Sequence, residues 1–152
     1  MEAWELAARE AIRDLVAAYS HFGDTGRFDE LCALFAPDGV LELDAGRSFA
    51  GRAAIRVFLG DTAGSVRTAG PRPYIRHHVS NHRIDVAGPD DASGAAYFFV
   101  VTERGPDHWG RYRDRYSRTD EGWRFAHRRV RLDGMSPTSW AAERRAALQS
   151  KS

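Results

Sequence analysis

The sequence predicts an α+β fold, in which three N-terminal helices pack against one concave face of a curved, mainly antiparallel sheet. In the first third of the chain apolar residues recur at helical spacing, whereas from Tyr74 onward they follow the pattern of strands. The segments 88–94 and 119–122 are rich in Gly and Asp, a composition typical of the hairpin connections that join antiparallel neighbours. Helices followed by such a sheet form layers around one core.

The first predicted helix covers residues 3–22 and is amphipathic. Tyr19 lies seven residues after Ile12 on its apolar stripe, so the phenol is expected to be buried and its hydroxyl to need a hydrogen-bonding partner. A Gly-rich corner ends this helix, and a short second helix is expected over residues 28–35. Asp24 stands at that corner, where the commonest role of an aspartate is to cap the following helix.

The remaining elements follow in order. We expect a strand at residues 40–43, a third helix through residues 52–59, a loop at 60–74, and four strands at 75–87, 94–104, 108–119 and 122–132. The length of 152 residues suits one domain with its own core, so residues 1–152 are predicted to form a single domain. Residues 134–152 are expected to be a tail or a short helix beginning near Ser139.

The charge balance argues against two classes of partner. Twenty-two basic residues oppose 21 acidic ones, and the net charge of +1 provides no field that would attract nucleic acid or an anionic membrane. A basic run late in the chain lacks an aromatic binding platform, and we interpret it as a solvated strand face; it comprises Arg124, Arg128, Arg129 and Arg131. The expected partner is a small-molecule substrate.

Metal binding and secretion are also disfavoured. Cys32 is the only cysteine, so neither an internal disulfide nor a cysteine cluster for zinc can form. His77, His78, His82 and Asp85 could be drawn as a metal cluster, but strand alternation separates His77 from the others. The acidic N-terminus and the lack of a long apolar run predict a cytoplasmic protein that does not enter a membrane.

The predicted strand at residues 75–87 carries three of the six histidines. Imidazole titrates near neutrality, with an ordinary pKa of about 6.5, so a histidine aimed into a cavity favours acid–base chemistry. Counting alternate residues back from Ile84 predicts that His78 faces the interior and that His77 and Asn81 face the other side. The alternative is that His78 is a half-buried, hydrogen-bonded histidine without chemistry.

Several short sequence motifs resemble those of one family in their order and spacing. They lie at residues 12–15, 31–38, 51–55, 78–85, 110–116 and 122–125. Together they make the chain similar, over about residues 8–133, to SnoaL-like members of the nuclear transport factor 2-like superfamily, which are cone-shaped α+β barrels. The resemblance implies that fold, no cofactor and no metal, whereas function varies widely on it.

Within that superfamily the chain most resembles the scytalone dehydratase and bile acid 7α-dehydratase type. Those enzymes use a tyrosine on the first helix, an aspartate after it and a strand histidine, and the matching positions here are Tyr19, Asp24 and His78. Where the bile acid enzyme carries a second acidic residue in the middle strand, this chain has Val100. The resemblance therefore implies a catalytic set of three residues but a different substrate.

The chemistry of such a set can be stated in general terms. An Asp24–His78 pair could abstract a proton next to a carbonyl or donate one to a leaving hydroxyl, and the Tyr19 phenol could bind the developing enolate oxygen. Tyr112 and Asp114 share one face of their strand and are candidate substrate contacts. Asp114 could instead neutralise nearby basic residues, which are Arg111, Arg113 and Arg115. Phe98 and Val100 complete the predicted substrate-binding set.

These observations favour a cofactor-independent lyase or isomerase, such as a dehydratase, cyclase or ketosteroid-isomerase-like enzyme, acting on a small apolar carbonyl or hydroxyl compound. Two alternatives stay open: a non-catalytic small-molecule binding protein, and an accessory subunit resembling the β subunit of a ring-hydroxylating dioxygenase. Exposed aromatics such as Phe99 and Trp109 on the convex face of residues 94–132 predict a homo-oligomer, either a dimer or a trimer.

Overall fold

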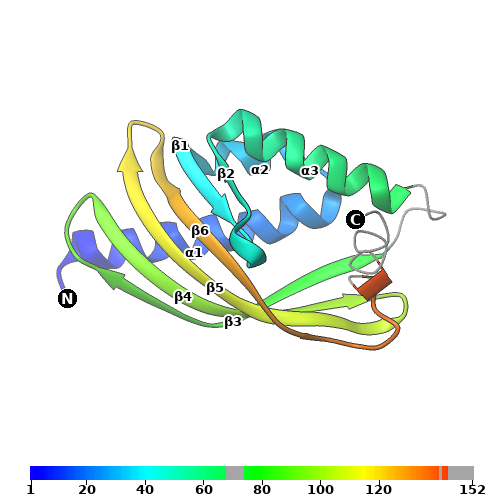
Figure 1. Ribbon diagram of the computed structural model, residues 1–152. Coiled ribbons are helices and arrows are strands. Elements are labelled where there is room, and N and C mark those ends of the chain that lie inside the picture. The colour runs from blue at the N-terminus through cyan, green and yellow to red at the C-terminus, as the bar shows by residue number, and fades with distance from the viewer. Residues whose placement is uncertain (68–73, 141, 144–152) are drawn as a thin grey trace.

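Three helices pack on one face of a six-stranded sheet that curves but does not close (Figure 1). The structure is a computed structural model, and it describes residues 1–67, 74–140 and 142–143. The helices are α1 (Ala3–Thr25), α2 (Phe28–Ala33) and α3 (Arg52–Arg67), with a short 3₁₀ turn at Asp44–Gly46. The strands are β1 (Phe35–Glu42), β2 (Ser48–Ala50), β3 (Ile75–Val86), β4 (Asp91–Thr102), β5 (Gly105–Thr119) and β6 (Gly122–Met135). The predicted α+β architecture is confirmed.

The strand order is β2-β1-β6-β5-β4-β3, and every neighbouring pair is antiparallel except β1 and β6, which run parallel. The sequence did not predict this parallel pair, because β1 begins at Phe35, earlier than the short strand expected at residues 40–43. The expected loop at residues 60–74 is wrong in its first half, since α3 continues to Arg67. Its other part, residues 68–73, lies outside the described residues, as does most of the helix expected after Ser139.

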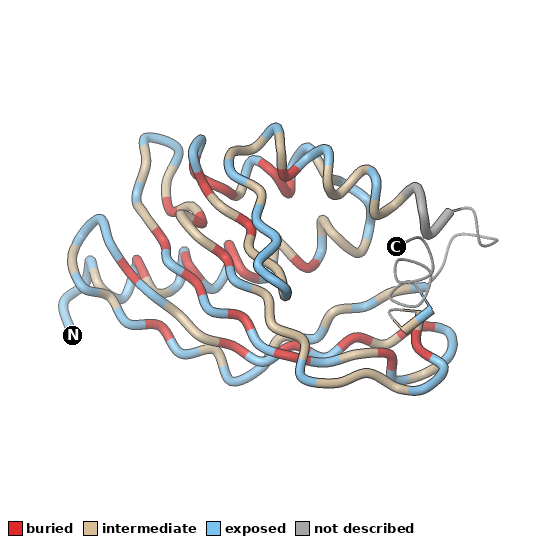
Figure 2. Tube along the Cα trace, in the orientation of Figure 1, coloured by how far each residue is buried: buried red, intermediate tan, exposed pale blue. Residues whose placement is uncertain are grey.

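The core lies between α1 and the inner face of the sheet. Buried and exposed residues alternate along the strands, so each strand turns one set of side chains toward the helices (Figure 2). Ile12, Leu15 and Val16 of α1 pack against Phe35 and Phe125. Among the described helices, none is long and apolar enough to cross a membrane.

A β-bulge in β3 determines which histidine faces this interior. The pairing of β3 with β4 changes register between Ser80 and Arg83, and Asn81 adopts a left-handed backbone with φ of 53°. The extra residue inverts the alternation, so that Ile84 is buried on one side of the bulge while His78 is exposed on the other. The expectation that His78 points inward is therefore wrong, and His77 occupies that side.

The bulge leads to a stability prediction for Asn81. A side chain with a β-branch is strained at positive φ by about 1–2 kcal/mol, whereas Gly is not. Asn81→Val should therefore lower the free energy of unfolding by about that amount, measured by urea denaturation. Asn81→Gly is the matched control. It should change the free energy of unfolding by no more than about 0.5 kcal/mol. Equal effects of the two variants would show that the left-handed conformation is not a constraint.

Candidate active site

Asp24 and His77 form an acid–base pair between α1 and β3. One carboxylate oxygen of Asp24 accepts a hydrogen bond from the backbone N–H of His77 at 2.9 Å, and the other lies 2.5 Å from ring Nδ1. Since β3 is an edge strand, this carboxylate satisfies an N–H that no neighbouring strand could reach. Asp24 does not cap α2, which begins after Arg27 without a side-chain cap. The structure thus joins Asp24 to the neighbour of the histidine that the sequence singled out.

A second pair, Asp107 and His108, lies on β5 beside the first. Ring Nδ1 of His108 is 2.7 Å from Asp107 Oδ2, and the Asp107 side chain is fully buried. The other carboxylate oxygen accepts the backbone N–H of Trp140 at 2.8 Å, so the chain after β6 fixes this aspartate in place. The His77 and His108 rings stand nearly perpendicular, with centroids 6.3 Å apart.

An aromatic row connects the two histidines to the middle of the inner face. The ring of His108 lies 6.0 Å from that of Phe98, which stacks on Tyr112 at 4.7 Å. Val100 is fully buried and stands opposite His77 on one side and His108 on the other in the strand register. Phe98, Val100 and Tyr112 therefore form an apolar wall next to both histidines.

Asp114 and Arg128 form a buried ion pair at the far end of this wall. Both side chains have essentially no exposed surface, and Arg128 donates two hydrogen bonds to the carboxylate, at 3.0 and 2.8 Å. The Tyr116 hydroxyl donates a third at 2.9 Å, and His82 lies 3.2 Å from that hydroxyl. Asp114 thus pairs with Arg128 and not with the exposed arginines of its own strand. The reading of Arg128 as part of a solvated face is wrong.

Tyr19 lies inside the fold against this ion pair. Its ring is in edge contact with Phe35, Tyr112 and Phe125. The Arg128 guanidinium covers the same group of rings, 4.2 Å from the centroid of Tyr19 and 4.0 Å from that of Tyr112. A planar cation stacked on aromatic faces is stabilised by their quadrupoles, which helps to offset the cost of its burial.

Burial determines the protonation states of these groups. Burial raises the pKa of Tyr19 and that of Tyr112 well above the ordinary value, although the charge of Arg128 opposes the rise. Both phenols therefore remain protonated at neutral pH and able to donate a hydrogen bond. Burial lowers the pKa of His108 despite its hydrogen bond to Asp107, and burial likewise lowers the pKa of His82.

The structure brings together most of the residues predicted from the sequence. Tyr19, Tyr112 and Asp114 gather around Arg128, while Phe98 and Val100 form the wall beside the histidines. The sequence analysis missed His77, Asp107, His108 and the inward position of Arg128. Asn81 was a usable signal for His77, because asparagine tolerates the left-handed backbone of a bulge. No local pattern distinguishes His108 from an ordinary strand histidine.

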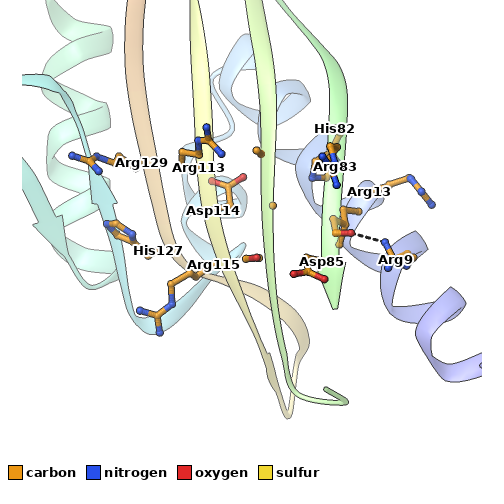
Figure 3. Close-up of a pocket in the computed structure, with 14 residues that line it drawn as sticks. Arg9, Arg13, His82, Arg83, Asp85, Arg113, Asp114, Arg115, His127 and Arg129 are labelled. Atoms are coloured by element: carbon orange, nitrogen blue, oxygen red, sulfur yellow. Dashed lines mark hydrogen bonds between the residues drawn. The ribbon is translucent and has the colours of Figure 1, made fainter. Parts of the chain in front are cut away.

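A basic groove with a volume of about 890 Å³ lies apart from the two Asp–His pairs. Figure 3 shows side chains from α1 and β3 along one side and from β5 and β6 along the other, including Arg13, Arg83, Arg113, Arg115 and Arg129. Ser93, Gly94 and Ala95 of β4 lie between them. Asp24, His77 and His108 do not line this groove. Within the described part of the chain, no cluster of three or more His, Cys, Asp or Glu side chains is placed to hold a metal ion.

The buried ion pair leads to a second stability prediction. Asp114→Asn leaves the Arg128 charge buried without a counter-charge, and breaking such a pair from one side costs about 3–5 kcal/mol. We expect a loss of that size in the free energy of unfolding, measured by denaturant titration. The matched control is Asp133→Asn, whose partner Arg111 is exposed, and it should cost less than about 1 kcal/mol. Similar losses for the two variants would contradict the central role of the buried pair.

The solved structures that are similar to this chain over most of its length include the following three. One is assigned provisionally as a scytalone dehydratase, from Novosphingobium aromaticivorans; it is 25% identical, the match covers 90% of this chain and 91% of that chain, and the TM-score is 0.77. Another from the same organism is an NTF2-like protein with a cystatin-like fold, 26% identical over 90% and 88% of the two chains, with a TM-score of 0.73. LinA is 18% identical over 90% and 93%, with a TM-score of 0.76, and its likeness shows the fold alone.

A comparison with curated proteins found no match. The family comparison is decisive, because a model of the SnoaL-like domain matches residues 4–129, which include all three helices, β1 to β5 and most of β6. The fold agrees with that match, since helices on an open, curved, mixed sheet are the NTF2-like arrangement of the neighbouring structures. This chain belongs to the family of SnoaL-like domains.

Proposed function

We propose that this protein is a cofactor-independent lyase or isomerase that moves protons on a small, largely apolar carbonyl or hydroxyl compound. The observation that carries the proposal is the Asp24–His77 pair, in which both carboxylate oxygens hold one histidine by its backbone and its ring. A carboxylate on Nδ1 fixes the tautomer and leaves Nε2 as the atom that exchanges protons. General acid–base catalysis needs such an oriented imidazole.

The tyrosines supply the other half of the chemistry. Removing a proton next to a carbonyl places negative charge on the carbonyl oxygen, and a protonated phenol donates a hydrogen bond to that charge. Burial raises the pKa of Tyr112, so it stays a donor, and its hydroxyl makes no hydrogen bond within the described part of the chain. Tyr19 lies beside it and is the second candidate donor.

The apolar wall suggests the kind of substrate. Phe98 and Val100 are buried side chains without hydrogen-bonding groups, next to the two imidazoles. They suit an aromatic or alicyclic carbonyl compound such as a polyketide or steroid-like intermediate. The neighbour that is assigned provisionally as a scytalone dehydratase supports a dehydration, at 25% identity.

Two alternatives come from other classes. A binding protein would need the apolar wall but not the oriented proton carrier, and an accessory subunit would need only its surface. Two Asp–His pairs inside the fold favour an enzyme over both, because burying four titratable groups costs stability and serves neither binding nor assembly.

A dehydration assay tests the proposal. The probe is the aldol adduct of benzaldehyde and acetone, whose dehydration gives the ultraviolet-absorbing benzylideneacetone. His77→Gln should lower kcat/KM by about 10² to 10⁴-fold, because it removes a proton carrier. Asp24→Asn should cost less, since an amide can still hold the ring but cannot stabilise an imidazolium.

His78→Gln is the matched control, because His78 is adjacent in sequence but faces the opposite side. It should retain most of the activity. A wild-type protein that neither dehydrates the adduct nor exchanges the α-protons of acetophenone for deuterium would favour the binding protein. Retention of activity by His77→Gln would remove the Asp24–His77 pair from the mechanism.

We also propose that the protein is a homo-oligomer built through the outer face of the sheet. Tyr97, Phe99 and Trp109 leave 56%, 39% and 38% of their surface exposed there, with Phe99 and Trp109 side by side in the register. Burying such aromatics against a second copy removes apolar surface from water.

Sedimentation tests this proposal. The protein should sediment as a dimer or trimer at micromolar concentration, and the double change Phe99→Asp with Trp109→Asp should shift it to a monomer, because charge replaces the apolar contact. Trp4→Asp is the control, since Trp4 is 47% exposed on α1, which packs on the other face of the sheet. A monomeric wild-type protein would contradict the proposal.

A further inference from the structure

In both Asp–His pairs a carboxylate oxygen lies against the same ring nitrogen, Nδ1, and the two rings are neighbours. In each pair the carboxylate lies against ring Nδ1, at 2.5 Å for His77 and 2.7 Å for His108. Neither ring makes another side-chain hydrogen bond within the described residues. Both imidazoles therefore have Nε2 free for a substrate, and the rings are 6.3 Å apart between centroids.

Two imidazoles this close influence each other's charge. A proton on one ring disfavours a proton on the other, because like charges at such a distance repel inside a protein of low dielectric. Such coupled groups titrate as a unit, in two separated steps.

Burial distinguishes the two rings. The His108 side chain is 14% exposed and the His77 side chain 24%, and Asp107 is fully buried, whereas Asp24 is 7% exposed. The charged form loses more hydration at the more buried ring. Burial lowers the pKa of His108, and the neighbouring charge of His77 lowers it further, while Asp107 opposes both effects. Phe98, which packs on His108 from β4, is apolar and adds no charge.

We propose that His108 is the general base of this site and His77, in its charged form, the general acid. The assignment rests on the proposed function and deepens it: two separate groups suit an elimination from a β-hydroxy carbonyl compound. When the surroundings of two titratable groups give them different pKa values, one group commonly acts as the acid and the other as the base.

The steps balance without a cofactor. The lone pair of His108 Nε2 takes the α-proton, and the electrons of the C–H bond form the new C=C bond as the C–O bond to the β-hydroxyl breaks. The departing hydroxyl takes the proton from His77 Nε2 and leaves as water. His108 ends protonated and His77 neutral, and one proton transfer between the rings, directly or through a water molecule, restores the starting state.

Two reactions separate this assignment from a single-histidine mechanism. Deuterium exchange at the α-carbon of acetophenone needs a base but no leaving group, whereas dehydration of the aldol adduct needs both. His108→Gln should lose about 10² to 10⁴-fold in both reactions. His77→Gln should lose dehydration by the same range yet keep exchange within about tenfold of the wild-type rate.

The opposite pattern overturns the assignment. If His108→Gln keeps both reactions while His77→Gln loses both, the proposed function stands and His108 has no catalytic role. If the wild-type protein shows neither reaction, the proposed function fails, and the influence of His77 on His108 is still decided by titration of the substrate-free protein.

That titration follows the histidine ring signals by nuclear magnetic resonance. The His108 signal should titrate with a midpoint below the ordinary value of an imidazole, because burial lowers the pKa of His108. His77→Gln should move that midpoint to higher pH, because the opposing charge of His77 is gone. Asp107→Asn should move it to lower pH, since a carboxylate no longer stabilises the charged ring. A His108 midpoint at or above the ordinary value of an imidazole, or one unmoved in His77→Gln, would overturn the division of roles.

Discussion

The buried contact between Asp114 and Arg128 is the interaction around which the interior is arranged. It connects the two strands β5 and β6 at the centre of the sheet, and the guanidinium then serves as a packing surface for Tyr19, Tyr112 and Phe125. The buried charge of Arg128 limits which side chains can surround it, because it requires a counter-charge on one side and aromatic ring faces on the others. The row of rings that leads from Tyr112 through Phe98 to His108 begins at this point.

Much of the fold could be predicted from the sequence, because it depends on local periodicity. The stripe that contains Ile12 and Tyr19 identified α1, and the glycine-rich connections identified the antiparallel order of the later strands. The parallel pairing of β1 with β6 could not be predicted in the same way. It joins segments far apart in the chain, and no turn connects them directly.

The sequence predicted most of the residues of the site but not which of them contact one another. Asp24, Tyr19, Phe98, Val100, Tyr112 and Asp114 all lie on the inner side. His78 does not, because one extra residue at Asn81 reverses a period of two. Arg128 was misjudged for a different reason: an arginine in a run of arginines is usually solvated, and only its contact with Asp114, fourteen residues earlier, distinguishes it from Arg129. Asp107 and His108 lacked any local signal, since the groups that hold and face this adjacent pair are the backbone N–H of Trp140, after β6, and the ring of His77, in β3.

The position of β6 has a consequence for how the chain folds. Among the described strands β6 is synthesised last, yet it lies between β1 and β5 in the sheet. Until it arrives, β1 and β2 have no sheet to join and Asp114 has no counter-charge. Before β6 is added, the edges of β1 and β5 that pair with it are open. Closing the sheet requires contacts between residues far apart in the sequence, which form slowly. Assembly of the interior must therefore wait until β6 has been synthesised.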